Sequence, residues 1–220
     1  MIYVAPEHEF EAAYGLPAAL PKGEHIIWQG SPDAKSLARH AFHVPKLAGY
    51  FALLLLLRGA LAVSDGLGIA EAMRSVAILA PLAVIGVALV ALIAWLVARS
   101  AVYTLTNRRV VMRIGVVLNI TFNLPLKTIG SAGLKLHSDG TGDIPLMLTT
   151  EDNIAYPHLW PHARPWQLKR TQPMLRSIPR AAHVGQLLAE ATALENTTSS
   201  RQPSSTRLPQ PAQDDWAAAA

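Results

Sequence analysis

The stretch AVYTLTNRRVVMRIGVVLNITFNLPL, residues 101–126, follows directly on the most hydrophobic part of the chain and decides its fold. A helix that crosses a membrane needs about 20 apolar residues, and Arg108, Arg109 and Arg113 interrupt this stretch too often for one. Apolar and polar residues alternate instead, most regularly over 119–126, and a period of two is typical of a half-buried strand. The stretch therefore predicts an antiparallel β-meander in water.

Two apolar segments precede this meander. Residues 76–98 contain no charged residue and are long enough to span a hydrocarbon core, so they predict a transmembrane helix. Residues 44–63 predict another, although Arg58 interrupts them five residues before their end. At about 1.5 Å of helix rise per residue, the guanidinium of Arg58 lies within snorkelling distance of the interface. With 64–75 as a short connecting loop, the two segments predict a transmembrane helical hairpin.

Lysine and arginine residues lie beside the outer ends of both segments rather than in the loop between them. Because cytoplasmic loops carry the excess of cations, this distribution predicts a multi-pass protein of the cytoplasmic (inner or intracytoplasmic) membrane with both termini in the cytoplasm. The cations before the first segment are Lys35, Arg39 and Lys46, those after the second are Arg99, Arg108, Arg109 and Arg113, and the loop holds only Arg74.

The meander continues after this stretch. Residues 131–138 and 144–149 have the alternation of strands, and the turn residues of 139–143 join them. Ser177 has the properties of a helix N-cap, and small and apolar residues recur at helical spacing behind it. Residues 177–195 therefore predict a helix that packs on the sheet.

These segments give the fold class of an α+β membrane protein in four parts. Residues 24–30 read as a strand within an otherwise extended N-terminal segment, and the Ser-, Thr-, Pro- and Gln-rich composition after Glu195 predicts disorder. The predicted parts are a cytoplasmic N-terminal segment (1–43), the transmembrane hairpin (44–98), a cytoplasmic β-meander domain with a C-terminal helix (99–195) and a disordered tail (196–220).

Composition narrows the classes of function. The chain has 220 residues, of which 51% are hydrophobic and only 15% are charged, and its net charge is +4. The absence of cysteine excludes a disulfide framework and any thiolate metal site. Lysine and arginine lie beside apolar segments rather than in one patch, which favours membrane lipids over nucleic acid as a partner.

No catalytic pattern emerges from the titratable residues. We find no nucleophile with a base and an orienting group, so the sequence predicts a protein that is not an enzyme. His40 and His43 lie three residues apart on a predicted helical approach to the membrane. Such a pair could ligate a metal or the magnesium of a chlorin, which leaves bacteriochlorophyll open as a cofactor, but contact with lipid phosphates is the favoured interpretation. No metal site is predicted.

The stretch AYPHLWPHARPWQLKR, residues 155–170, has no regular period. Tryptophan and arginine dominate interface energetics, and a proline-stiffened loop loses little entropy on docking, so a docking loop is one interpretation. The other is that its tryptophans cover an edge of the sheet. Because its three prolines lack an N–H, we expect side-chain contacts rather than backbone hydrogen bonds to hold the loop. The candidate partner-binding residues are Trp160, His162, Arg164 and Trp166.

Several stretches resemble known families. YTLTNRRVVMRIGVV, LPLKTIGSAGL and GTGDIPLML together resemble the bacterial pleckstrin-homology (PH)-like domain that follows a membrane hairpin in small envelope proteins. The stretches LPKGEHIIWQGSPDAKSLARHAFHV and LWPHARPWQLKRTQPMLRSIPRAAHVGQLLAEA, with the helical hairpin, are similar to the PuhB family of photosynthetic-complex assembly proteins of purple bacteria. This resemblance covers roughly residues 15–195, and LWPHARPW and QPMLRSIP are its most specific parts.

The PuhB resemblance implies a non-enzymatic assembly factor that helps to build the reaction centre–light-harvesting 1 core complex. Its partners would be subunits of that complex, and it would act as a homodimer. Arg58 is a further candidate for partner binding, because an unpaired cation inside a membrane is unfavourable. The PH-like pattern alone leaves open a generic membrane-anchored envelope protein that binds lipid or protein.

Overall fold

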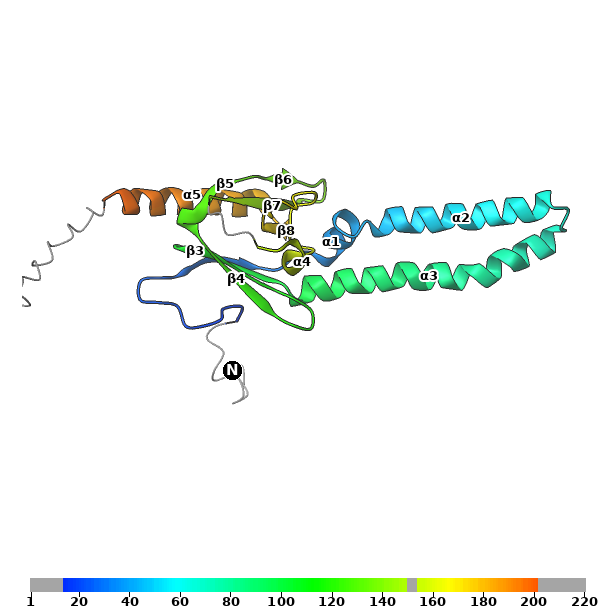
Figure 1. Ribbon diagram of the computed structural model, residues 1–220, viewed down its shortest axis with the longest axis horizontal. Coiled ribbons are helices and arrows are strands. Elements are labelled where there is room, and N and C mark those ends of the chain that lie inside the picture. The colour runs from blue at the N-terminus through cyan, green and yellow to red at the C-terminus, as the bar shows by residue number, and fades with distance from the viewer. Residues whose placement is uncertain (1–13, 150–153, 202–220) are drawn as a thin grey trace, which may run out of the picture.

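A computed structural model describes residues 14–149 and 154–201. The molecule is elongated, and a β-rich domain continues at one end into a long pair of helices (Figure 1). The fold class predicted from the sequence is confirmed: two long apolar helices, an antiparallel β domain and a C-terminal helix follow one another along the chain.

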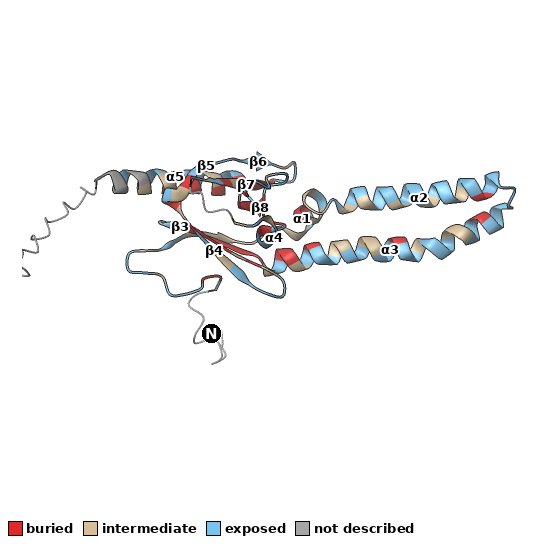
Figure 2. Cartoon of the chain, in the orientation of Figure 1, coloured by how far each residue is buried: buried red, intermediate tan, exposed pale blue. Residues whose placement is uncertain are grey.

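The helical pair consists of α2 (Val44–Ser64) and α3 (Ile69–Ser100), which lie side by side (Figure 1). Both are long and apolar enough to cross a membrane. Their contacts use small residues such as Ala62 and Ala72, which are buried, while most other side chains of the pair are exposed (Figure 2). Soluble proteins rarely expose an apolar surface this extensive, so the pair has the surface of a candidate membrane hairpin.

The helix α3 begins seven residues earlier than the apolar segment 76–98, so the connecting loop is shorter than the predicted 64–75. Its first turns contain helix-forming residues, and Glu71 lies in the first turn, where the helix dipole favours an acid. The apolar run identifies only the part of the helix that is suited to a membrane. The residues before it also favour helix, so α3 begins earlier.

The first sheet is an antiparallel meander in the order β1-β2-β3-β4, as predicted for 101–126. Its strand β1 comes from before the hairpin, and it pairs with β2 with Gly30 opposite Tyr103. The N-terminal segment is therefore part of the β domain rather than a separate extension. The strands are β1 (Ile26–Gly30), β2 (Val102–Thr106), β3 (Arg109–Ile114) and β4 (Ile120–Pro125).

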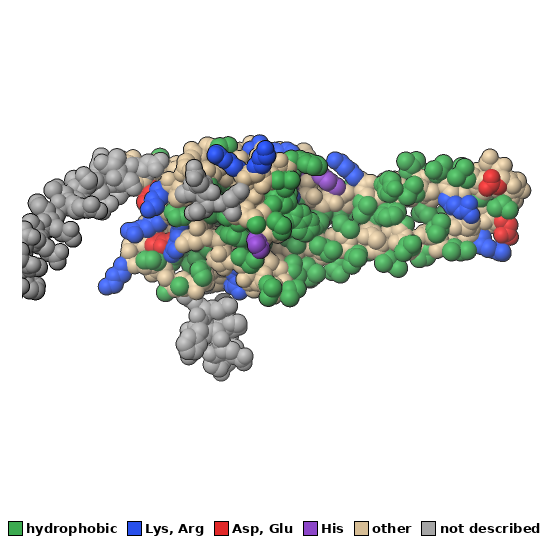
Figure 3. Space-filling view, viewed as in Figure 1, with side chains coloured by type: hydrophobic (Ala, Val, Ile, Leu, Met, Phe, Trp, Pro, Cys, Tyr) green, Lys and Arg blue, Asp and Glu red, His purple; other side chains and the backbone are tan. Residues whose placement is uncertain are grey.

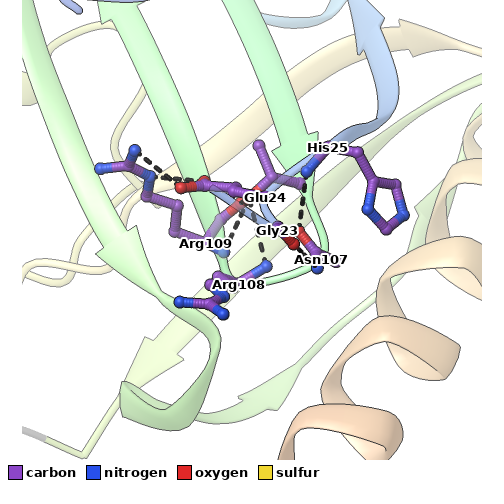
Figure 4. Close-up of polar contacts among 7 residues, drawn as sticks. Gly23, Glu24, His25, Asn107, Arg108 and Arg109 are labelled. Carbon is purple, nitrogen blue, oxygen red and sulfur yellow. Dashed lines mark hydrogen bonds and ion pairs between the residues drawn. The ribbon is translucent and has the colours of Figure 1, made fainter. Parts of the chain in front are cut away.

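Polar contacts fasten the N-terminal segment to the β2–β3 turn (Figure 4). Arg109 donates two hydrogen bonds to the Glu24 carboxylate, from Nε at 2.7 Å and from Nη2 at 2.9 Å. Thr106 donates a third at 2.8 Å, and the Asn107 side chain bridges the backbones of Gly23 and His25. The Glu24 side chain is only 2% exposed.

A short 3₁₀ helix, η2 (Leu126–Thr128), leads into the second sheet, in which β7 is central. The predicted strand 131–138 is split, because its two halves pair with different parts of β7. Leu134 and Leu136 are exposed. The strands are β5 (Ile129–Ala132), β6 (Lys135–Leu136), β7 (Thr141–Leu148) and β8 (Met174–Pro179).

The predicted helix start at Ser177 is wrong. Ser177 lies in β8, where Ile178 pairs with Gly142 and the Ser177 N–H donates to the Asp143 carboxylate at 2.8 Å. These tertiary contacts outweigh the local capping signal, and α5 (Ala181–Arg201) begins only after the strand ends. The buried residues of α5 are Ala181, Val184, Leu188 and Ala191.

The helix α5 also extends to residue 201, into the tail 196–220 that the composition predicted to be disordered. The remainder of that tail, 202–220, lies outside the described residues. The buried face of α5 joins Tyr103, Met112, Ile144 and other residues of both sheets in one hydrophobic core.

Candidate functional site

The short helix α1 (Ala34–His40) holds the base of the hairpin against the β domain. The N–H of Asp33 donates to the carbonyl of Ser177 at 2.8 Å, and the hydroxyls of Ser36 and Thr141 lie 2.6 Å apart. Leu37 is fully buried against Val97 and Ala98 near the end of α3. These contacts give the two helices a fixed connection to the domain.

A cavity of about 1190 Å³ opens at this connection, and we call it the junction cleft. Its walls come from three separated segments, 39–46, 133–145 and 156–176. The middle segment belongs to β6, β7 and the turn between them, and the last includes β8 and α4 (Tyr156–Leu159). The candidate residues of the sequence analysis, apart from Arg58 and His162, line this cleft.

Trp160 and Trp166 lie at the surface. Trp160 is 54% exposed and Trp166 is 94% exposed, so neither covers an edge of the sheet as a core residue would. One side of the Trp160 ring contacts Phe42 edge-on, with ring centroids 5.7 Å apart. The structure therefore favours the docking interpretation of this loop over the core interpretation.

We call residues 155–170 the tryptophan loop. Hydrogen bonds hold its backbone, contrary to the expectation from its prolines. The N–H of Arg164 donates to the carbonyl of Gln172 at 2.9 Å. The N–H of Met174 donates to the carbonyl of His162 at 2.8 Å. The prolines fall between the residues that form these bonds, so they do not prevent the pairing. Arg164 is exposed, and its guanidinium donates to the Gln172 side chain at 2.9 Å.

His162 is not a surface residue, and its prediction as a partner-binding residue is wrong. It is 1% exposed, and its Nδ1 lies 2.5 Å from the hydroxyl of Tyr103. Burial and the nearby positive charge of Arg176 lower the pKa of His162 to about 3. A neutral, buried histidine bonded to a buried tyrosine stabilises the core instead of contacting a partner.

His40 and His43 do not form a pair, because α1 ends at His40 and the chain turns before α2 begins. His40 instead stacks on His137 with ring centroids 3.9 Å apart, and its Nε2 lies 3.7 Å from Asp139. Burial and the neighbouring His137 lower the pKa of His40. His43 is exposed at the start of α2.

No metal site is evident in the part of the chain that the structure describes, where no three His, Cys, Asp or Glu residues are placed to hold an ion. Positive charge predominates in the junction cleft. Figure 3 shows cationic and histidine side chains at the junction between the domain and the apolar hairpin. The charged residues that line the cleft are Arg39, Lys46, Lys135, Arg164 and Arg176, with Asp143 as the acid.

Sequence reasoning missed His137 and Arg176 as members of this site. His137 directly follows β6 and Arg176 lies in β8, so both come near α1 only through the pairing of these strands with β7. No local pattern marks either residue. Arg58 lies on the exposed surface of α2, and no described residue of the chain forms an ion pair with it.

The fold and site together define a class of protein in which a PH-like domain is joined to an apolar helical hairpin, with a cationic cleft at the junction. The model of the family described as "Bacterial PH domain" matches residues 50–192. The chain belongs to this family.

A relative supports the narrower resemblance as well. The chain is 40% identical over 187 residues, 84% of this chain and 87% of the relative, to an uncharacterized 23.7 kDa protein in the puhA 5′ region of Rhodobacter capsulatus. This finding confirms the similarity to the PuhB family. No solved structure matches the chain significantly.

Proposed function

We propose that this protein is a non-enzymatic assembly factor for the photosynthetic reaction centre–light-harvesting 1 core complex. The relative in the puhA 5′ region of a purple bacterium supports a role related to photosynthesis. In this proposal, α2 and α3 cross the cytoplasmic membrane and both termini lie in the cytoplasm. The protein acts as a homodimer on subunits of the core complex.

The observation that carries the proposal is the pair of exposed indoles beside the base of the hairpin. Trp160 and Trp166 present large apolar surfaces from a loop whose backbone is fixed by hydrogen bonds. A fixed aromatic surface binds a partner with little loss of conformational entropy. A membrane-embedded client would contact this surface where its own helices leave the bilayer.

Arg58 has a separate role in the proposal. It lies exposed on α2, within the candidate membrane-spanning segment. An intramembrane cation is costly unless it is paired. We propose that Arg58 pairs with an acidic or polar group, either on a helix of the client or on the second copy of the homodimer.

The test is a strain that lacks the gene and carries either the wild-type copy or Trp160→Ala/Trp166→Ala. The double variant should reduce the near-infrared absorbance of the core complex while the amount of the protein itself in membranes is unchanged, because both side chains are exposed. Trp28→Ala is the matched control. Trp28 is partly buried and packs against the core, so its loss should destabilise the domain and deplete the protein and the core complex together.

Normal core-complex absorbance in the double variant would contradict the docking role of the loop. Normal absorbance in the strain without the gene would contradict the assembly function as a whole.

A further inference from the structure

We propose that the junction cleft binds the phosphate head group of an anionic membrane lipid. The inference starts from Arg176, which is only 9% exposed and lines the cleft. Its Nε has no hydrogen-bond partner among the residues that the structure describes. Buried N–H groups are nearly always paired, and a guanidinium matches the geometry of phosphate oxygens. An acceptor from outside the chain would satisfy this group.

A second buried nitrogen without a hydrogen-bond partner in the described part of the chain belongs to His137, which lines the same cleft. The His137 side chain is 5% exposed, and its Nε2 also has no hydrogen-bond partner among the described residues. Asp143 Oδ2 lies 3.3 Å from this nitrogen, while Asp143 Oδ1 accepts the N–H of Ser177. His137 and Arg176 therefore both line the cleft, and each has a buried side-chain nitrogen without a hydrogen-bond partner among the described residues.

The charge of the cleft suits an anion. Five lysine and arginine residues line it, against the single carboxylate of Asp143. Asp143 repels an anion, but the cations outnumber it, and charge–charge attraction inside a partly closed cleft is stronger than at an open surface.

A lipid fits the cleft better than free phosphate. Pro45 and Lys46, in the first turn of α2, line the cavity, so it opens at the level where the candidate membrane helix begins. The exposed side chains of Leu134, Trp166 and Leu168 add apolar walls. A glycerol backbone and acyl chains would contact such walls, and tryptophan favours the head-group region of a bilayer. The inference rests on the membrane placement in the proposed function, but not on the assembly role.

The full-length protein in dodecyl maltoside micelles provides the test. Binding of dioctanoyl phosphatidylglycerol, dioctanoyl phosphatidylcholine and inorganic phosphate is measured separately by native mass spectrometry. We expect phosphatidylglycerol to bind at least about tenfold more tightly than either other probe. Lys46→Gln/Lys135→Gln should weaken it by about tenfold or more. Both residues are exposed, so the fold should be retained. Lys127→Gln, also exposed but outside the cleft, is the control and should bind as wild type.

Arg176→Lys adds a second test, because it keeps the charge and removes the Nε donor. This variant should also weaken phosphatidylglycerol binding. If the Arg176→Lys protein does not fold, the result for the double lysine variant tests the inference alone. Equal binding of the two lipids, inorganic phosphate binding as tightly as phosphatidylglycerol, or an unchanged affinity in the lysine variant would each overturn the inference. None of these measurements uses core-complex yield, so they do not test the assembly function.

Discussion

At the scale of single residues, Glu24 makes a long-range contact with Arg109 that we expect to stabilise the domain. Glu24→Gln removes the ionic partner of Arg109, which is 85 residues away in sequence. Charge-assisted hydrogen bonds contribute more than neutral ones, so we expect a loss of about 2 kcal/mol in the free energy of unfolding. Thermal unfolding of the detergent-solubilised protein, followed by near-ultraviolet circular dichroism, measures it. Glu71→Gln breaks an exposed pair with Arg74 and should change stability little.

The same carboxylate should contribute to acid denaturation. Burial raises the pKa of Glu24, but the hydrogen bonds from Arg109 and Thr106 outweigh burial and lower it below its ordinary value of 4.5. The stabilisation is therefore complete above pH 4.5 and is lost as the pH falls through the folded-state pKa. The Glu24→Gln variant should lack this part of the acid sensitivity.

The burial of His162 predicts that the stability of the domain also depends on pH in a less acidic range. Its folded-state pKa is about 3, against about 6.5 in the unfolded chain, because burial and the facing charge of Arg176 disfavour the imidazolium. The unfolded state therefore takes up the proton first, and stability is lost as the pH falls from 6.5 toward 3. Between pH 7 and pH 5 we expect a loss of about 2 kcal/mol from this residue.

Denaturant titrations at pH 7 and pH 5 compare the wild type with His162→Phe. The variant should be less stable at pH 7, because the Tyr103 hydroxyl loses His162 as a hydrogen-bond partner. Its loss between the two pH values should be smaller than that of the wild type. A loss of equal size would show that His162 takes up a proton in the folded protein as readily as in the unfolded chain.

At the scale of elements, the sequence predicted what depends on local periodicity and missed what depends on pairing. The meander β2-β3-β4 followed from alternation alone. The start of α5 did not, because Ser177 satisfies a local capping rule and yet is held in β8 by Asp143.

The turn between β3 and β4 exposes two apolar side chains, Val117 and Leu118, which we call the tip of the turn. Arg113 pairs with Val102, just after α3 ends, so the tip projects back alongside the base of α3 (Figure 1). Val117 is 88% exposed and Leu118 is 79% exposed. Gly115 makes this tight turn possible, since its φ is +124° and a Cβ would lie 2.0 Å from the carbonyl oxygen of Leu118. We expect the tip to dip into the lipid interface.

The lack of cysteine makes this tip easy to probe. Val117→Cys labelled with the fluorophore NBD should show a blue-shifted emission in liposomes, because the dye then lies among lipids. Lys127→Cys is the control on the same chain and should emit as in water. Water-like emission at both positions would mean that the tip stays clear of the bilayer.

At the scale of the whole molecule, topology is the property that the proposed function most depends on. The two candidate spans and the flanking cations predict that the α2–α3 loop lies across the membrane from the β domain. In intact cells with a permeabilised outer membrane, an impermeant maleimide should label Asp65→Cys. It should label Lys127→Cys only after the cytoplasmic membrane is also broken. Labelling in the reverse order would place the domain outside the cytoplasm.

The candidate site was only partly predictable at this scale. Trp160, Arg164 and Trp166 are conspicuous in a proline-rich stretch, and their place at the surface agreed with the docking interpretation. Arg176 and His137 become neighbours of α1 only when the second sheet has formed, so no reading along the chain could group them.

The pairing of β1 with β2 has a consequence for how the protein is made. The two strands flank the hairpin, and the N–H of His25 bonds to Asn107, 82 residues further along the chain. During synthesis β1 leaves the ribosome first and has no partner until both helices and β2 have followed. If α2 and α3 cross the membrane as proposed, the sheet can close only when the two strands meet on the same side of the bilayer. A chain with one helix left uninserted would keep β1 unpaired, and proteases could recognise it. In the proposed topology, a closed sheet therefore requires that β1 and β2 lie on the same side of the membrane.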